Sequence, residues 1–405
     1  MTADRPDGTP DRSDTTRLRG ASASLVADAI RDRDPLPGTR GFAGLLADPR
    51  AAVDEPDRTV ARDPVLVRDV LGRQPLFVET DATDPAEPGA WSFDRNDLRN
   101  PEPVPAGSVV SASERDRRWS LPTYAPSRPG AAQAAVDDAI DATLAEFAAE
   151  TADPSTGRLA VAFSGGVDSA LVASAVPDAP CYVAGFEGCH DVAAAREAAA
   201  EMELDLRVVA LSHDDLRRAI PDIASATGRR NPMDLNIAVP LYLTAEAAAA
   251  DGIDRLAVGQ GADELFGGYS KVVDPANDDR VDADTVRGAR TETVRTLPAQ
   301  LERDVPALRA AGVEPVAPLL DDRVVDAALR LPGDLLATAD ERKVALRRAA
   351  AGRVPESAYA ADKKAVQYGT YVSREIDRLA RRNGFKRRMD DHVGRYVDAL
   401  LEGTV

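Results

Sequence analysis

The stretch that decides the fold is Ser164-Gly165-Gly166-Val167-Asp168-Ser169, directly after the apolar run Leu159-Ala160-Val161-Ala162-Phe163. Glycines let backbone N–H groups approach an anion closely, and the following helix points its positive end at that anion. The pattern therefore predicts a buried strand, a phosphate-binding turn and a helix. A carboxylate such as Asp168 does not suit a phosphate, but it suits Mg²⁺, which bridges carboxylate and phosphate oxygens. The stretch is not a Walker loop, which would end in Gly-Lys-Ser/Thr. The competing interpretation is an ordinary tight turn between a strand and a helix.

The segments around this loop alternate between strand and helix patterns. This alternation predicts an α/β fold with a parallel sheet that carries helices on both faces, and ligands bind at the carboxyl ends of such strands. We expect strands over 159–163, 182–186, 206–211 and 255–258, and helices over 168–175, 191–203, 213–227 and 236–250.

The rest of the chain divides by composition. Residues 1–25 read as a disordered acidic tail, and short apolar runs broken by Pro, Gly and Asp predict a small β-rich domain over 35–122. A second domain is expected over 130–385, beginning with an alanine-rich helix over 132–150 and mostly helical after Tyr269. Residues 386–405 read as a charged C-terminal tail.

Composition limits the classes of protein. The 405 residues carry a net charge of −18 and contain no apolar run long enough to span a membrane. The first residues lack the apolar core of a secretory signal, and two cysteines cannot form a disulfide framework, so we expect a cytoplasmic protein. The acidity opposes binding to nucleic acid or membranes and is typical of a halophilic protein in molar salt.

Lysine is scarce, since only five of the 50 basic residues are lysines. Where arginine is the default cation, a retained lysine indicates a site that needs a compact point charge. Lys343 is the lysine that lies in a stretch with helical spacing, between Glu341 and Arg347.

A second glycine-rich loop follows the expected strand over 255–258. It reads Gly259-Gln260-Gly261-Ala262-Asp263-Glu264-Leu265-Phe266-Gly267-Gly268-Tyr269. It repeats the logic of the first loop, with glycines for close approach and then a carboxylate. Asp168 and Asp263, at the ends of neighbouring strands, could hold one Mg²⁺ or a pair against a triphosphate. A dinucleotide-binding loop is excluded because the third glycine is missing.

The two loops together resemble the synthetase domain of the class B, glutamine-dependent asparagine synthetases, which belong to the PP-loop ATP pyrophosphatases. Two further segments fit the family's order. The stretch over 314–321 resembles its Glu-x-Arg-x-Pro-Phe-Leu-Asp segment, although Val316 and Leu319 depart from it. Lys343-Val344-Ala345-Leu346-Arg347 resembles its Lys-Tyr-x-Leu-Arg segment. The likeness covers about residues 159–371.

The resemblance implies roles for individual residues. The pyrophosphate of ATP would be held by the first loop, adenosine would meet the main chain at the strand ends, and two aspartates would bind Mg²⁺. Lys343 would neutralise charge on the transferring phosphoryl group, and Glu264 would lie beside the metal or the incoming amine. The residues concerned are Ser164, Gly165, Gly166 and Ser169 for pyrophosphate; Ala162, Ala184, Val258, Gly259 and Gly261 for the nucleotide; and Asp168 and Asp263 for the metal.

The implied reaction joins a carboxylate, aspartate by default, to AMP with release of pyrophosphate, and an amine then attacks the acyl-adenylate. The N-terminal region resembles a degenerate glutaminase domain, notably over 41–45 and 68–77. Arg40 occupies the place of the family's nucleophilic cysteine, and a guanidinium cannot replace a thiolate. We therefore expect no glutamine hydrolysis. Free ammonia or another amine would be the nitrogen donor, and the resemblance leaves a homodimer open.

Gln260 is a second departure, because the family usually has a glutamate there that helps to deprotonate the amine. Glutamine forms hydrogen bonds but takes no proton at neutral pH. The proton could pass to the adenylate phosphate or to Glu264, or the nucleophile could differ.

Two other functions remain open at the level of sequence. An RNA-modifying pyrophosphatase usually needs paired cysteines and a basic face, whereas Cys181 and Cys189 stand in an acidic chain. The histidines, His190, His213 and His392, lack metal-ligand spacing. A non-catalytic nucleotide-binding regulator is the third interpretation, and the retention of Asp168, Asp263 and Lys343 argues against it.

Overall fold

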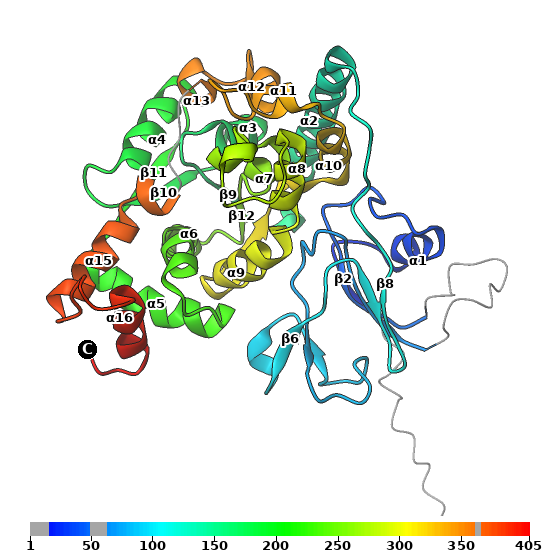
Figure 1. Ribbon diagram of the computed structural model, residues 1–405, viewed down its shortest axis with the longest axis horizontal. Coiled ribbons are helices and arrows are strands. Elements are labelled where there is room, and N and C mark those ends of the chain that lie inside the picture. The colour runs from blue at the N-terminus through cyan, green and yellow to red at the C-terminus, as the bar shows by residue number, and fades with distance from the viewer. Residues whose placement is uncertain (1–15, 49–62, 361–365) are drawn as a thin grey trace, which may run out of the picture. The chain divides into compact units, whose positions relative to one another are not determined.

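The computed structural model describes residues 16–48, 63–360 and 366–405. The chain forms two compact units, residues 1–121 and 122–405 (Figure 1). The boundary falls at Leu121–Pro122, at the end of the range 35–122 over which the β-rich domain is predicted.

Within residues 16–48 and 63–121, the N-terminal unit is built from two antiparallel sheets and one α-helix; the short apolar runs predict its strands. The larger sheet has the strand order β1-β2-β3-β7-β8, and the smaller has the order β5-β4-β6. The core includes Leu45, Leu66 and Val110 of the larger sheet together with Val78 and Trp91 of the smaller one. The elements are β1 (Arg17–Arg19), α1 (Ala23–Asp32), β2 (Ala43–Leu46), β3 (Val65–Arg68), β4 (Phe77–Glu79), β5 (Trp91–Ser92), β6 (Pro101–Pro103), β7 (Ser108–Val110) and β8 (Arg115–Arg117).

The predicted disordered tail over 1–25 is wrong for its last ten residues. β1 pairs with β2, and α1 begins at Ala23 with Ser22 as its N-cap. Val26 and Ile30 of α1 are buried, which explains the order, because the helix contributes apolar surface that a solvated tail would not. Residues 1–15 lie outside the described residues.

The second unit contains the predicted parallel sheet. Its strand order is β11-β10-β9-β12-β13, and all four pairings are parallel. The strands are β9 (Leu159–Ala162), β10 (Cys181–Gly185), β11 (Leu206–Ala210), β12 (Arg255–Ala257) and β13 (Glu314–Val316). The first four confirm the sequence prediction. β13 was not predicted, because its three residues include Pro315 and carry no strand pattern; at the sheet edge the missing N–H is tolerated.

Helices cover both faces of this sheet, as predicted. α6 packs across β9, β10 and β11 on one face, while α3 contacts β9 and α4 contacts β10 and β11. α5 and α9 pack on α6 and complete the apolar core. The helices are α2 (Pro129–Thr151), α3 (Val167–Ala175), α4 (His190–Glu201), α5 (His213–Thr227), α6 (Pro232–Ala250), α7 (Ala262–Phe266), α8 (Val286–Val294), α9 (Leu297–Ala310), α10 (Asp322–Leu329), α11 (Gly333–Leu336), α12 (Val344–Ala350), α13 (Glu356–Tyr359), α14 (Val366–Gly369), α15 (Val372–Arg382) and α16 (His392–Leu401).

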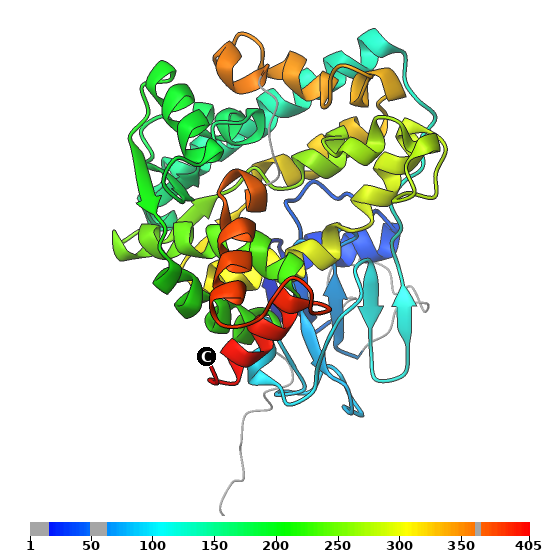
Figure 2. The same cartoon turned by 60° about the vertical axis from the view of Figure 1, so that its left-hand side comes forward.

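The range 386–405, expected to be a charged tail, is an integral part of the second unit. It contains α16, which packs against α15 and α5 (Figure 2). Tyr396 and Val397 of α16 are buried in the same core as the central strands. Only one face of α16 is apolar, which is why the charge-rich sequence concealed it.

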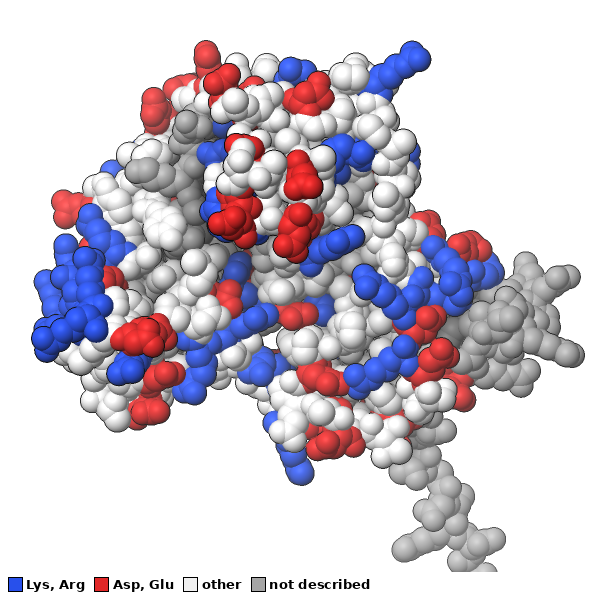
Figure 3. Space-filling model, in the orientation of Figure 1, with Lys and Arg blue, Asp and Glu red and all other residues white. Residues whose placement is uncertain are grey.

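No helix among residues 16–48, 63–360 and 366–405 is long and apolar enough to cross a membrane. The acidic charge is unevenly distributed. Basic side chains gather on the side where α15 lies (Figure 3), and α15 itself carries Arg374, Arg378, Arg381 and Arg382. Several of these pair with acidic neighbours, such as Arg378 with Glu375.

Candidate active site

The first loop lies at the carboxyl end of β9, the central strand of the sheet. Ser164 Oγ and Ser169 Oγ are 3.3 Å apart, and Ser169 Oγ donates to the carbonyl of Gly166 at 3.1 Å. Gly165 has φ +74°, and a Cβ there would lie 2.5 Å from the carbonyl oxygen of Ala194 in α4. Glycine is therefore required, and α3 begins directly after the loop with Gly166 as its N-cap.

The second loop lies at the carboxyl end of β12, beside the first. A Cβ on Gly259 would come within 2.7 Å of Asp168 Cβ and 3.1 Å of the Ser169 backbone nitrogen. The absence of a side chain at Gly259 thus allows the two loops to touch. Gly261, with φ +88°, starts α7, which carries Asp263.

Lys343 joins the two predicted metal ligands. Its Nζ lies 2.8 and 2.7 Å from the two carboxylate oxygens of Asp168 and 2.6 Å from Asp263 Oδ1. The Lys343 and Asp168 side chains are buried, whereas the Asp263 side chain is 45% exposed. Gly268 makes this packing close, since a Cβ there would lie 2.4 Å from Lys343 Cε. Residues separated by up to 175 positions therefore form one charged cluster.

The two aspartates determine the charge state of Lys343. Burial would lower the pKa of the Lys343 ammonium, but attraction to Asp168 and Asp263 outweighs burial and raises it above its ordinary value. Lys343 is therefore charged. It stands in the left-handed region, with φ +56°, at the start of α12. Such backbone strain in a non-glycine residue is typical of a functional position.

The two aspartates fit a magnesium ion by the chemistry of their donors. Mg²⁺ in phosphate-binding enzymes is held by one or two carboxylates together with the phosphates. Asp168 and Asp263 both face the Lys343 ammonium, and the Asp263 side chain is 45% exposed. Among residues 16–48, 63–360 and 366–405, no group of three or more His, Cys, Asp or Glu side chains is placed to hold a metal. The remaining ligands would have to be phosphate oxygens and water.

The residues expected near adenosine lie at adjoining strand ends. Ala162 ends β9 and pairs with Tyr182, Ala184 lies in β10, and Val258 follows β12. Val258 is held by its N–H, which donates to the carbonyl of Val316 at 2.9 Å. The structure therefore brings these positions to the same edge of the sheet as the two loops.

Glu264 is buried on α7 next to Asp263. Its Oε1 accepts a hydrogen bond from the Tyr269 hydroxyl at 2.5 Å. Burial and the neighbouring charge of Asp263 raise the pKa of the Glu264 carboxyl, although the hydrogen bond from Tyr269 lowers it. Tyr269 belongs to the motif, but its partnership with Glu264 was not predicted.

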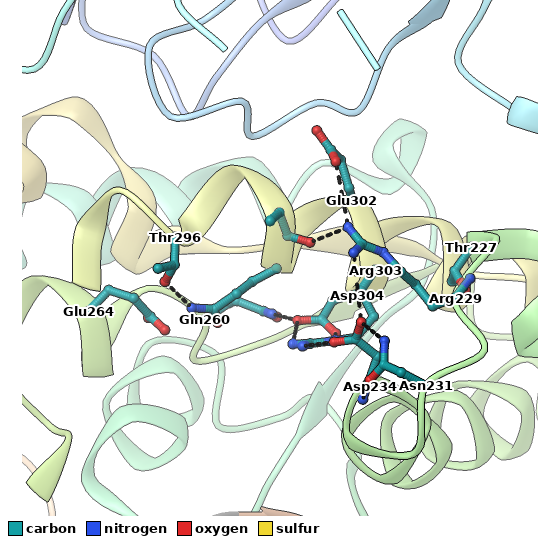
Figure 4. Close-up of polar contacts among 12 residues, drawn as sticks. Thr227, Arg229, Asn231, Asp234, Gln260, Glu264, Thr296, Glu302, Arg303 and Asp304 are labelled. Carbon is teal, nitrogen blue, oxygen red and sulfur yellow. Dashed lines mark hydrogen bonds and ion pairs between the residues drawn. The ribbon is translucent and has the colours of Figure 1, made fainter. Parts of the chain in front are cut away.

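Gln260 belongs to a buried polar network that the sequence analysis missed. Its Nε2 donates to Asp304 Oδ2, and Asp304 also accepts from Arg303 at 2.7 and 2.9 Å (Figure 4). Arg303 Nη1 donates onward to Asp234 Oδ1 at 3.0 Å, near the start of α6. Arg229, 3.7 Å from Asp234, extends the network to the surface. No sequence signal points to Asp304, because it lies 44 residues from Gln260 on another helix.

The cysteines lie in β10 and at the start of α4, and two of the histidines pair with acidic residues of α15. Cys181 and Cys189 are both buried free thiols, and burial raises the pKa of Cys181 to about 12. Neither is the thiolate that a sulfur-transfer reaction needs. His213 and His392 instead pair with Glu375 and Asp377 in and around α15.

Comparison with known proteins identifies the family of the chain. The chain matches the family model of asparagine synthase over residues 140–287 and 274–399. The chain belongs to this family. It is 27% identical over 283 residues to the "Putative asparagine synthetase (glutamine-hydrolyzing) 1" of Methanocaldococcus jannaschii, which covers 61% of this chain and 52% of the relative. It is 26% identical over 193 residues to asparagine synthetase B (glutamine-hydrolyzing) of Escherichia coli, covering 42% of this chain and 33% of the relative.

The asparagine synthetase of Asparagus officinalis is 25% identical over 305 residues, covering 66% of this chain and 47% of the relative. The chain thus spans about half the length of the first curated relatives that it matches. The matched region contains both glycine-rich loops and Lys343.

Proposed function

We propose that the protein is an ATP-dependent carbon–nitrogen ligase of the asparagine-synthetase type. It would join a carboxylate to AMP with release of pyrophosphate and then convert the acyl-adenylate to an amide. The single observation that carries this proposal is the ammonium of Lys343 between Asp168 and Asp263 at the meeting point of two glycine-rich loops. Aspartate is the default carboxylate, because the relatives are named asparagine synthetases.

Each residue has a task in the activation step. Backbone N–H groups of the Ser164–Ser169 loop and the start of α3 would bind the pyrophosphate part of ATP. Asp168 and Asp263 would hold Mg²⁺, which when bound supplies positive charge against the phosphate oxygens. Lys343 would then turn its ammonium from the aspartates to the phosphoryl oxygens, where negative charge builds up.

The nitrogen donor in this proposal is free ammonia or another small amine. In place of the family's cysteine the N-terminal unit has Arg40, and the two cysteines of the chain are both in the second unit. The protein would therefore release no glutamate from glutamine. Detection of glutamate release by the purified protein, at a rate matching amide formation, would contradict this part.

The decisive experiment is carboxylate-dependent exchange of labelled pyrophosphate into ATP. It should be run with Mg²⁺ in molar KCl across a carboxylate panel that includes aspartate, with and without ammonium. We expect exchange with at least one carboxylate and amide formation once ammonium is added. Exchange with a carboxylate other than aspartate would retain the mechanism and change the substrate. No exchange with any carboxylate would reject the adenylate-forming mechanism and favour the interpretation as a non-catalytic nucleotide-binding regulator.

A further inference from the structure

The structure points to Asp304 as a positioning residue that makes Gln260 the binding group for the attacking amine. We infer that Gln260 accepts a hydrogen bond from the amine N–H through its Oε1, and that Asp304 fixes the amide in that orientation. This inference rests on the proposed amide-forming function. It assigns a specificity role to a helix, α9, which lies outside both glycine-rich loops.

The orientation of the Gln260 side chain follows from the chemistry of its partner. An ionised carboxylate only accepts hydrogen bonds, so an amide facing Asp304 must present its NH₂ group to it. The Oε1 of Gln260 therefore points away from Asp304. Gln260 is half-buried, and within the described part of the chain its side chain bonds to Asp304 alone. A fixed acceptor is thus left free one residue from Gly259, which touches Asp168 and Ser169.

Asp304 is itself held rigidly. It is 1% exposed, and Arg303 donates to both of its oxygens. Burial would lower the pKa of Arg303, but Asp304 and Asp234 raise it, so the guanidinium stays charged. A buried carboxylate with these three donors has little freedom to rotate, and neither has the amide that it holds (Figure 4).

The same contacts explain why residue 260 carries an amide. A glutamate there would place a second carboxylate within hydrogen-bonding distance of Asp304, and like charges at that distance oppose ionisation of both. Gln260 avoids this repulsion and still offers an oxygen. An acceptor that carries no charge suits a neutral amine bearing N–H groups, such as ammonia.

The amination step balances without a base at residue 260. The amine lone pair forms the C–N bond, and the C–O bond to AMP breaks with its electron pair leaving on the phosphate oxygen. One N–H proton is released and passes to the departing phosphate, since the Gln260 amide takes no proton. Gln260 orients the amine nitrogen toward the acyl carbon.

Three variants test this inference by separating the two half-reactions. Gln260→Leu removes the acceptor, and Asp304→Asn removes the group that fixes it. Each should raise the KM for ammonia about tenfold, the effect of one hydrogen bond, and leave pyrophosphate exchange within about twofold of wild type. The double variant Gln260→Glu/Asp304→Asn exchanges the two groups, so that the amide is at residue 304 and the carboxylate at residue 260. Residue 260 then again offers an oxygen to the amine, and the KM for ammonia should return to within about threefold of wild type.

Asp377→Asn is the matched control, because Asp377, like Asp304, accepts hydrogen bonds from arginine side chains but lies on α15. It should alter neither exchange nor the KM for ammonia, and thermal melts of all variants identify general unfolding. An unchanged KM in Gln260→Leu, or equal losses of exchange and amination in both single variants, would overturn the inference. Absence of exchange in the wild type would instead reject the proposed function.

Discussion

Each unit of the protein contains a buried ion-pair cluster, and the two clusters are built differently. In the N-terminal unit, Arg73 and Asp69 pair at 2.8 Å with side chains 2% and 0% exposed. They lie four residues apart, and Asp69 also accepts from the backbone N–H groups of Leu71 and Arg73. In the second unit, Lys343, Asp168 and Asp263 come from three segments that are far apart in the sequence, and the Asp263 side chain is 45% exposed.

The difference separates an ion pair that holds a turn from one that can exchange partners. Every oxygen of Asp69 is occupied by its own turn, so the pair stabilises local structure. Lys343 and its aspartates instead bring three positions to one point that is partly exposed at Asp263, and under the proposed function a metal ion and phosphates would take over the same charges there. Both clusters contain buried charged side chains, so burial alone does not distinguish them. They differ in how far apart their residues lie in the sequence and in the exposure of Asp263.

The largest effect is expected from Lys343→Ala. Under the proposed function, loss of the ammonium removes the charge that would face the transferring phosphoryl group, and pyrophosphate exchange should fall about 10³-fold. Lys386→Ala, at an exposed lysine that caps a carbonyl, is the matched control and should keep wild-type exchange. Equal exchange rates in the two variants would remove Lys343 from the mechanism.

The next effect concerns stability and not activity. Asp69→Asn removes the buried negative charge that pairs with Arg73 at 2.8 Å and should lower the unfolding free energy of the N-terminal unit by about 3 kcal/mol. Trp91 and Trp119 are the two tryptophans of the chain and both belong to this unit, so fluorescence during urea unfolding reports on it alone. Pyrophosphate exchange at low urea should stay unchanged. A large loss of exchange would show that the two clusters do not act independently.

A smaller effect should follow from Gly268→Ala. The new methyl group would meet Asp263 Oδ1 and Lys343 Cε at 1.9 and 2.4 Å, so both side chains must move. Misplacement of about 1 Å should reduce exchange by roughly 10- to 100-fold with little change in the melting temperature. Gly130→Ala is the matched control, because Gly130, like Gly268, lies outside the left-handed region and a Cβ there meets nothing within 4 Å.

The smallest effect is a pH-dependent one at Glu375. Burial would raise its pKa, but the hydrogen bonds and charges of His213, Arg374 and Arg378 lower it below the ordinary value. A lowered carboxyl pKa stabilises the fold above about pH 4.3, the ordinary glutamate value, and this contribution is lost as the pH falls through the native pKa. Glu375→Gln should therefore cost about 1 kcal/mol at pH 7 and little at pH 3, measured by circular dichroism. An equal cost at both values would contradict the assignment.

The sequence predicted most of the second unit because its signals are local. Each apolar run that ends in a glycine-rich or polar turn identified a strand of the parallel sheet, and both glycine-rich loops were found with their aspartates. The prediction failed where tertiary packing overrides composition. α1 and α16 were read as parts of polar tails, although each buries one apolar face, with Ile30 and Tyr396 among the buried residues. β13 gave no strand pattern because Pro315 occupies its centre.

The sequence by itself determined the chemistry of the site: two glycine loops, two carboxylates and a rare lysine that favour activation by ATP. Only the tertiary structure decided which groups share a point in space. It placed Lys343 between Asp168 and Asp263, and Asp304 against Gln260 across 44 residues. The physical reason is that glycine turns and strand periodicity depend on neighbouring residues, whereas charge pairing depends on how helices pack after the chain has folded.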